Sequence, residues 1–172
     1  MPLVKGGKIV SDAFAHVADD AALPEQGALL VTAKRFLSDP EGLLTRAAGK
    51  LGVLWPNNRD VDDLVPYLGR LAVIALVFPT FRDGRAYSQA RLLRERYAYR
   101  GELRATGQVL RDQFVFMLRA GFDAFEVKKQ ADAEAFTETV KRYSVFYQPT
   151  GDGRLSALHQ RMQLRHSESA GL

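Results

Sequence analysis

The sequence contains no cysteine among its 172 residues. This absence excludes disulfide bonds, thiolate zinc sites, cysteine-ligated iron–sulfur clusters and a cysteine nucleophile. Histidine is also scarce, because only His16, His159 and His166 are present, near the two ends of the chain. A histidine-rich metal site in the middle of the chain is therefore excluded, and the sequence predicts neither a metal nor a cofactor.

Long apolar runs and targeting signals are missing as well. No stretch approaches the ~20 consecutive apolar residues of a transmembrane helix, and no apolar segment follows basic residues at the N-terminus as in a secretory signal. No GxGxxG follows a predicted strand, and no phosphate-binding P-loop motif is present. No serine–histidine–aspartate triad is predicted, because the histidines lie toward the two ends. These absences predict a soluble, cytoplasmic protein with no membrane contact.

What the chain does contain is the composition of one globular domain. Hydrophobic residues make up 47% and charged residues 26%, which is typical of a folded soluble protein with a single core. The formal net charge is +4 and the pI is near 9.5. This mild basic excess permits an anionic ligand or partner but does not indicate nucleic acid.

The N-terminal residues 1–17 are predicted to form a β-hairpin. Gly6 and Gly7 separate the short apolar runs Leu3–Val4 and Ile9–Val10, and a Gly-Gly pair supplies the positive φ that a tight turn needs. Residues 28–148 are predicted to form a single α/β domain, since short apolar runs alternate there with amphipathic stretches. Residues 149–172 are predicted to be a mobile basic tail.

Within the α/β domain, the clearest strand is LAVIALVF at residues 71–78. Eight consecutive apolar residues are typical of a strand buried on both faces of a parallel sheet. The fold class is therefore α/β, with a mostly parallel sheet of about five strands and flanking helices. The sheet is either open and three-layered or a barrel fragment. The other strands are expected at 28–32, 53–55, 103–106 and 124–127, and helices at 33–48, 60–68, 86–99, 108–120 and 131–147.

The loop after the clearest strand is the first candidate binding site, because ligands of such sheets bind beyond the carboxyl ends of the strands. It reads FRDGR, with Tyr87 and Ser88 opening the next helix. Arginines beside free backbone N–H groups suit oxyanions such as sulfate, sulfite or phosphate. A purely structural role competes with this one and is the commoner arrangement: Asp83 caps the helix, Gly84 makes the turn and both arginines are solvated. The predicted residues of this loop are Arg82, Asp83, Gly84, Arg85, Tyr87 and Ser88.

Three more residues join this candidate site from the next strand and its loop, namely Arg104, Arg111 and Asp112. In a parallel sheet, the loop that follows Thr106 lies at the same edge as Arg82 and Arg85. Arginine within a short strand is unusual unless it is paired or at an edge. A salt bridge of Arg104 with Glu102 or Asp123 is therefore the competing structural explanation.

The basic excess of the chain is concentrated in residues 82–111. Eight arginines stand there against three acidic residues, a local balance of +5. The functional interpretation is a positive face for an anionic ligand or an acidic partner protein. The structural interpretation is a solvated helix face with pairs such as Arg91–Glu95. The eight are Arg82, Arg85, Arg91, Arg94, Arg96, Arg100, Arg104 and Arg111.

The segments FRDGR, YSQARLLRER, GELRATGQVLRDQ and GFDAFE, all within residues 78–127, resemble a bacterial family of unknown function. Members of that family are described as oxidoreductases involved in sulfite reduction. Their genes neighbour those for assimilatory sulfite reductase and phosphoadenylylsulfate reductase. The resemblance implies a place in assimilatory sulfur metabolism and carries over no catalytic residue.

Because the chain has no cysteine and no nucleotide fingerprint, it has no evident redox group of its own. We therefore expect an accessory role at the sulfite-reduction step: the arginine-rich face binds an anion or docks on sulfite reductase or another sulfate-assimilation enzyme. Two further functions stay open. One is an enzyme acting on a small sulfur or phosphate oxyanion, with Asp83, Tyr87 or Asp112 supplying acid–base chemistry. The other is a non-catalytic anion sensor.

Overall fold

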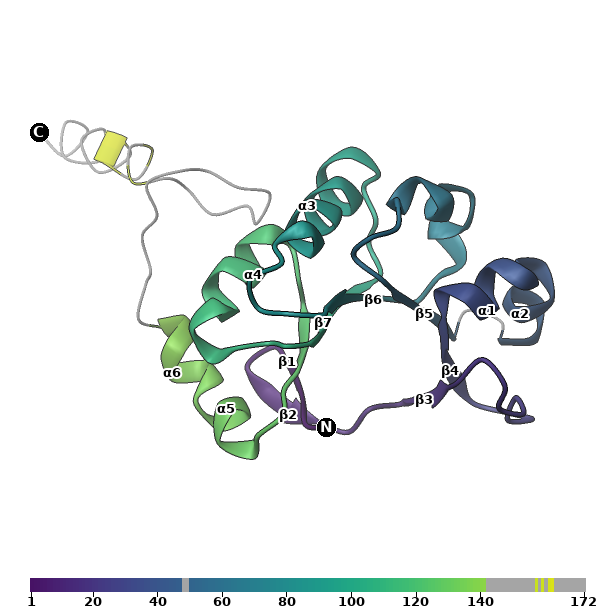
Figure 1. Cartoon of the computed structure of the whole chain (residues 1–172). Helices are drawn as coiled ribbons and strands as arrows, with labels where there is room; N and C mark the ends of the chain where they lie inside the picture. Colours follow the sequence, from purple (N-terminus) through teal and green to yellow (C-terminus); the bar gives the residue numbers. More distant parts are fainter. Residues whose placement is uncertain (48–49, 142–156, 158, 160, 163–172) are drawn as a thin grey trace, which may run out of the picture.

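The computed structural model describes residues 1–47 and 50–141, together with residues 157, 159, 161 and 162. The predicted tail over 149–172 lies almost entirely outside these residues. Figure 1 shows one sheet with helices packed around it. Its eight strands are β1 (Leu3–Lys5), β2 (Lys8–Val10), β3 (Phe14–Val17), β4 (Ala28–Thr32), β5 (Leu51–Trp55), β6 (Val73–Phe78), β7 (Glu102–Gly107) and β8 (Ala124–Glu126).

The strand order in the sheet is β2-β1-β8-β7-β6-β5-β4-β3. All neighbours from β3 to β8 pair in parallel, whereas β1 is antiparallel to both β2 and β8. The α/β class is thus confirmed, but the sheet is mixed and has eight strands rather than about five. The predicted hairpin is present as β1 and β2, with Gly6 and Gly7 at positive φ in its turn.

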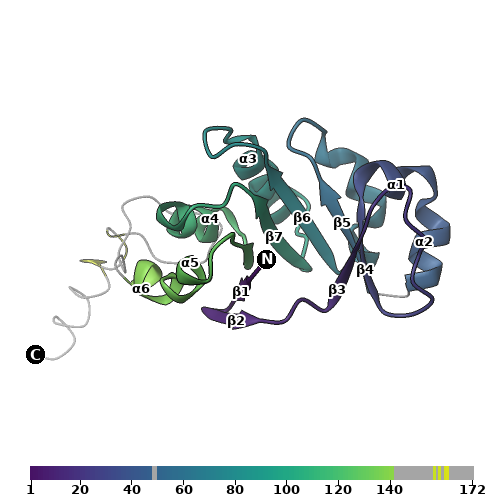
Figure 2. The same ribbon diagram turned by 60° about the horizontal axis from the view of Figure 1, so that its bottom comes forward.

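The sheet curls, and its helices lie on the outer side of the curl (Figures 1 and 2). The strand order explains this arrangement. Strands β3 to β8 follow one another in both chain and sheet, and right-handed crossovers in one direction place every connecting helix on the same face. The other face then closes on itself, as in an α/β barrel. Of the two predicted arrangements, the structure resembles the barrel fragment and not the open three-layer sheet.

Most predicted helices are present with shifted ends. The helix expected at 33–48 divides at Pro40, and the one expected at 60–68 is a 3-10 helix that contains Pro66. The helix expected at 86–99 ends in a π-helical turn. The elements are α1 (Ala33–Ser38), α2 (Pro40–Ala47), η1 (Val61–Arg70), α3 (Arg85–Arg91), η2 (Leu92–Arg96), η3 (Arg111–Gln113), α4 (Phe114–Ala120), α5 (Gln130–Glu134) and α6 (Phe136–Lys141).

The main core lies between the outer face of the sheet and the helices. Alternate residues of β7 show how the two faces divide. Leu103 and Ala105 belong to the outer core, whereas Arg104 and Thr106 point to the inner face, where both bond to Glu126. The other half of the inner face is apolar, with a small buried cluster of Leu30, Val73 and Ala75. One half of the concave face is therefore polar and buried.

Candidate functional site

The loops after β6 and β7 lie side by side at the carboxyl edge of the sheet, as predicted. The backbone N–H of Phe81 donates to Oε1 of Gln108 at 3.1 Å, and Nε2 of Gln113 donates back to the Phe81 carbonyl at 3.1 Å. The Gln108 N–H also donates to the carbonyl of Phe78 at 2.8 Å. Side-chain amides thus join the two loops into one surface.

Within the first loop, Asp83 and Arg85 pair with each other. Nε and Nη2 of Arg85 donate to the two oxygens of Asp83 at 3.0 and 2.7 Å. These hydrogen bonds hold the pKa of Asp83 well below its usual range. Gly84 is the N-cap residue of α3, so Asp83 does not cap that helix, although it accepts the Arg85 backbone N–H at 3.3 Å. The Arg85 charge is therefore already neutralised.

Tyr87 is half-buried and packs against the core. Its ring packs edge-on against Phe78 and lies close to Phe122. Burial, followed by the charge of Asp112, raises the pKa of Tyr87 to about 12. Its hydroxyl therefore stays protonated at neutral pH and is a poor general base. Ser88 follows on the exposed side of α3.

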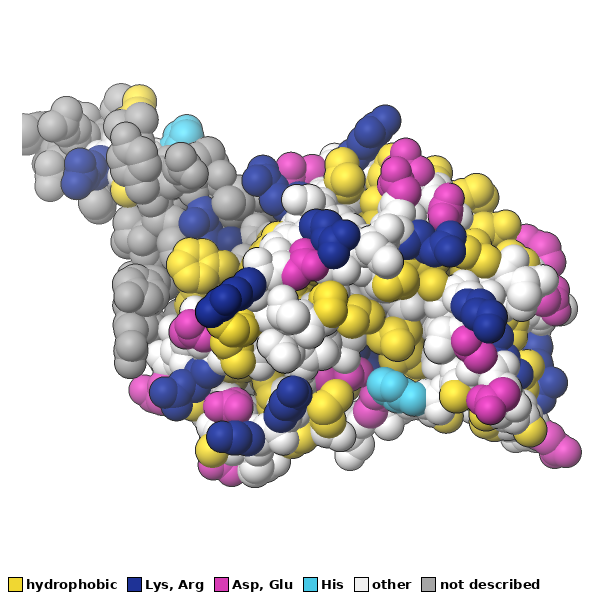
Figure 3. Space-filling view, viewed as in Figure 1, with side chains coloured by type: hydrophobic (Ala, Val, Ile, Leu, Met, Phe, Trp, Pro, Cys, Tyr) yellow, Lys and Arg dark blue, Asp and Glu magenta, His cyan; other side chains and the backbone are white. Residues whose placement is uncertain are grey.

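The remaining predicted arginines at this edge are Arg82 and Arg111. Among the described residues, no carboxylate lies within ion-pair distance of either one. Phe81 and Leu110 are the chain neighbours of these arginines, and Phe116 lies in α4, which follows; their exposed fractions are 43%, 39% and 64%. We call these five residues the edge surface. Figure 3 shows exposed hydrophobic side chains interspersed with basic ones over α3 and α4.

Arg104, the ninth predicted residue, does not join the edge surface. It lies on the inner face and is 1% exposed. Its guanidinium donates to Glu102 at 2.9 Å, to Glu126 at 3.0 Å and to Asp12 at 2.6 and 3.2 Å. Burial alone would lower the pKa of Arg104, but hydrogen bonds and charges from these carboxylates raise it. The salt bridge predicted between Arg104 and Glu102 is thus confirmed.

Two more arginines of segment 82–111 are paired within the fold. Asp123 pairs with Arg94 instead of Arg104, and Arg94 also donates to the carbonyls of Tyr99 and Gly101. Arg91 pairs with Glu95 across one helical turn, as the solvated-face interpretation predicts. Several of the eight arginines therefore hold the fold together rather than face a ligand.

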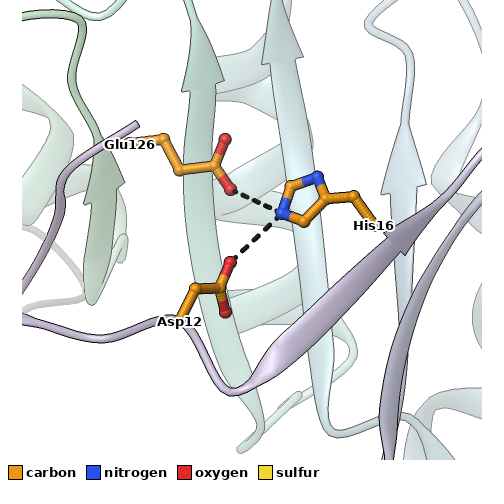
Figure 4. A group of neighbouring side chains, drawn as sticks. All are labelled: Asp12, His16 and Glu126. Atoms are coloured by element: carbon orange, nitrogen blue, oxygen red, sulfur yellow. Dashed lines mark hydrogen bonds and ion pairs between the residues drawn. The ribbon is translucent and has the colours of Figure 1, made fainter.

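Around Arg104 the inner face gathers a cluster that sequence reasoning missed (Figure 4). Nε2 of His16, on β3, lies 3.1 Å from Oδ2 of Asp12 and 3.6 Å from Oε1 of Glu126. Thr106 Oγ1 donates to the other Glu126 oxygen at 2.6 Å. The signal in the sequence was Arg104 itself, because a buried arginine in a strand requires several carboxylates around it.

The charges in this inner cluster do not balance. Asp12, Glu102 and Glu126 contribute three negative charges, while Arg104 and Lys5 contribute two positive ones; Lys5 reaches Glu102 at 2.7 Å. With a neutral His16 the cluster is one positive charge short. Glu126 is buried, and buried charges need compensation, so the cluster attracts a cation.

Asp12 makes stability depend on pH in the acid range. Partial burial would raise its pKa, but hydrogen bonds from Arg104, the Phe14 N–H and His16 outweigh burial and lower it from 3.8. When folding lowers the pKa of a carboxyl group, the ionised group stabilises the fold at pH values above its pKa in the unfolded chain. This stabilisation is lost as the pH falls through the pKa of the folded state. We expect the wild type and Asp12→Asn to differ less in their free energy of unfolding below about pH 4 than at pH 7. Urea unfolding between pH 7 and pH 3 measures it, and a constant difference would contradict the prediction.

Within the described part of the chain, no helix has both the length and the apolar character required to cross a bilayer. Comparison with curated proteins finds no match. A family model described as a bacterial protein of unknown function (DUF934) matches residues 52–158, more than half of the chain. The matched span contains the edge surface, Arg104 and Glu126, but neither Asp12 nor His16. The chain belongs to this bacterial family of unknown function, DUF934.

Proposed function

We propose that this protein is a cytoplasmic accessory protein of assimilatory sulfur metabolism that docks through its edge surface on an acidic patch of sulfite reductase. The resemblance of residues 78–127 supports the pathway. The edge surface supports docking as the mode of action. The main observation is that Arg82 and Arg111 have no carboxylate partner among the described residues and have exposed apolar side chains as chain neighbours.

This combination favours a protein partner over a small anion. Aromatic side chains and arginine are enriched where proteins bind one another, and they carry much of the binding energy. A compact oxyanion pocket would need several arginines aimed at one point. Arg85 is instead occupied by Asp83, and Arg104 is enclosed by carboxylates on the inner face. Two arginines beside Phe81 and Leu110 suit an acidic protein surface with an apolar centre.

Charge reversal tests the docking surface. We expect the double variant Arg82→Glu and Arg111→Glu to bind sulfite reductase at least tenfold more weakly, because two attractive contacts become repulsive. Binding is measured by biolayer interferometry with purified reductase at 50 and 300 mM NaCl. The wild-type complex should weaken with salt, since exposed charges are screened.

The matched control reverses two exposed lysines at the opposite edge of the sheet, Lys8→Glu and Lys50→Glu. This variant has the same net charge as the test variant and should retain most of the wild-type affinity. If both variants lost the same affinity for the reductase, binding would depend only on the net charge of the protein and not on the edge surface. No binding of the wild-type protein to the reductase would reject the proposal, and thermal stabilisation by sulfite or sulfate would then favour the anion sensor.

A further inference from the structure

Three metal-ligating side chains meet on the inner face, away from the edge surface. Asp12 comes from the loop between β2 and β3, His16 from β3 and Glu126 from the end of β8. Figure 4 shows the imidazole and both carboxylates directed toward one another. Glu126 is the last residue of β8, and the carboxyl ends of parallel strands are where α/β sheets place ligand sites.

The spacing of the donor atoms fits one small metal ion. His16 Nε2 lies 3.1 Å from an Asp12 oxygen and 3.6 Å from a Glu126 oxygen, and all three donors lie within 4.8 Å of one another. Zinc bonds to nitrogen and oxygen are about 2.0–2.2 Å long. Tetrahedral ligands at that bond length are about 3.3–3.6 Å apart, so the two separations measured from His16 are close to those of donors that share one ion.

Neighbouring groups hold the two carboxylates in place. Thr106 donates to the Glu126 oxygen that does not face His16, and the Phe14 N–H and Arg104 hold the second oxygen of Asp12. Such outer contacts orient ligands in metal sites. Arg104 also touches the two oxygens that face His16. Each carboxylate oxygen has two lone pairs, so one can accept from Arg104 while the other faces the ion.

The net charge of the cluster and its exposure to solvent also favour a bound metal ion. The cluster is one positive charge short when His16 is neutral, and neutral imidazole is the form that ligates metals. The His16 side chain is 50% exposed and that of Asp12 is 23% exposed, so an ion and a water ligand can enter from solvent. A set of one nitrogen and two carboxylate donors without thiolate suits zinc or manganese.

We infer that Asp12, His16 and Glu126 bind a single divalent metal ion, zinc or manganese, on the inner face of the curled sheet. The ion takes a water as a further ligand, and its two positive charges more than offset the single excess negative charge of the cluster. This site does not depend on the docking role, because it shares no residue with the edge surface.

Thermal unfolding and calorimetry test the site on the full-length protein after dialysis against EDTA. We expect added ZnCl₂ or MnCl₂ to raise Tm with one-to-one stoichiometry, because an ion that binds only the folded state stabilises it. His16→Gln should weaken that binding at least tenfold. Since His16 is half exposed, this variant should fold like the wild type. Co²⁺ adds a readout, since its visible spectrum should report nitrogen and oxygen ligands in the wild type alone.

The matched control removes the other histidines, His159→Gln and His166→Gln, and should bind the ion like the wild type. Equal affinity in His16→Gln would show that the ion binds elsewhere and would overturn the inference. Absence of any binding by the wild type would overturn it too, and would leave the cluster as a hydrogen-bonded network that joins β3 to β7 and β8. Neither outcome involves the reductase, so both are independent of the docking test.

Discussion

Arg104→Met is expected to lower the free energy of unfolding by about 3–5 kcal/mol, because breaking a buried ion pair leaves charge uncompensated. Arg104 is 1% exposed and faces Asp12, Glu102 and Glu126. Methionine fills similar space but donates no hydrogen bond. Three carboxylates would then share the inner face with only Lys5 to offset them. Urea unfolding at pH 7 measures the loss.

Two comparisons separate buried electrostatics from the loss of a surface arginine. Arg91→Met removes an exposed pair with Glu95 and should cost less than about 1 kcal/mol. The double variant Arg104→Met and Glu126→Gln should lose less than the sum of its two single variants, because the two residues interact directly. The Arg104→Met deficit should also shrink on acidification, as Asp12, whose pKa is lowered by Arg104 among other contacts, becomes protonated. Equal losses for Arg104→Met and Arg91→Met would contradict this account.

Gly107→Ala is expected to cost about 2–5 kcal/mol, the sum of backbone strain and overpacking. Gly107 ends β7 with a φ of +93°, a conformation that residues with a Cβ rarely adopt. A Cβ at this position would lie 2.4 Å from the backbone carbonyl oxygen of Phe78. That oxygen already accepts the Gln108 N–H, so the clash falls on a backbone atom that cannot move aside easily.

The control for this prediction is Gly69→Ala. Gly69 lies in η1, has no positive φ, and an added Cβ would contact nothing within 4 Å. Its substitution should change stability little or raise it slightly, since alanine reduces the freedom of the unfolded chain. Thermal unfolding of both variants measures the difference. A Gly107→Ala protein as stable as Gly69→Ala would refute the strain argument. Since Gly107 precedes the loop of Leu110, a folded Gly107→Ala variant should also bind the reductase more weakly.

The pattern of the chain predicts the parallel strands well where apolar runs are long. LAVIALVF corresponds to β6, and the runs near residues 28–32, 53–55 and 103–106 correspond to β4, β5 and β7. Strand β3 is not predicted as a separate strand, because its four residues, FAHV, include a histidine and fall within the range of the predicted hairpin. They form a strand because β4 supplies a parallel partner, and local sequence carries no information about such a partner.

The candidate site is predictable from the sequence only in its local part. The loops after β6 and β7 are expected at one edge, because consecutive parallel strands end together, and their amide contacts confirm it. The prediction that Arg104 joins them is wrong. Side chains alternate between the two faces along β7, so Arg104 points to the inner face, while Leu103 and Ala105 face the helices. Neighbouring residues of a strand face opposite ways, so residues of one segment do not form one surface.

The sequence by itself determined the α/β class, the hairpin, the alternation of strands and helices from β4 onward, and the concentration of arginines in residues 82–111. Local hydrophobic patterns and turn residues suffice for these. Only the tertiary structure decided which arginines of residues 82–111 pair with carboxylates of the described chain, and only it brought His16 to Glu126. Asp12 and Arg104 are 92 residues apart in the chain. They meet because one-directional crossovers place every helix outside and curl the sheet until its two ends share one inner face.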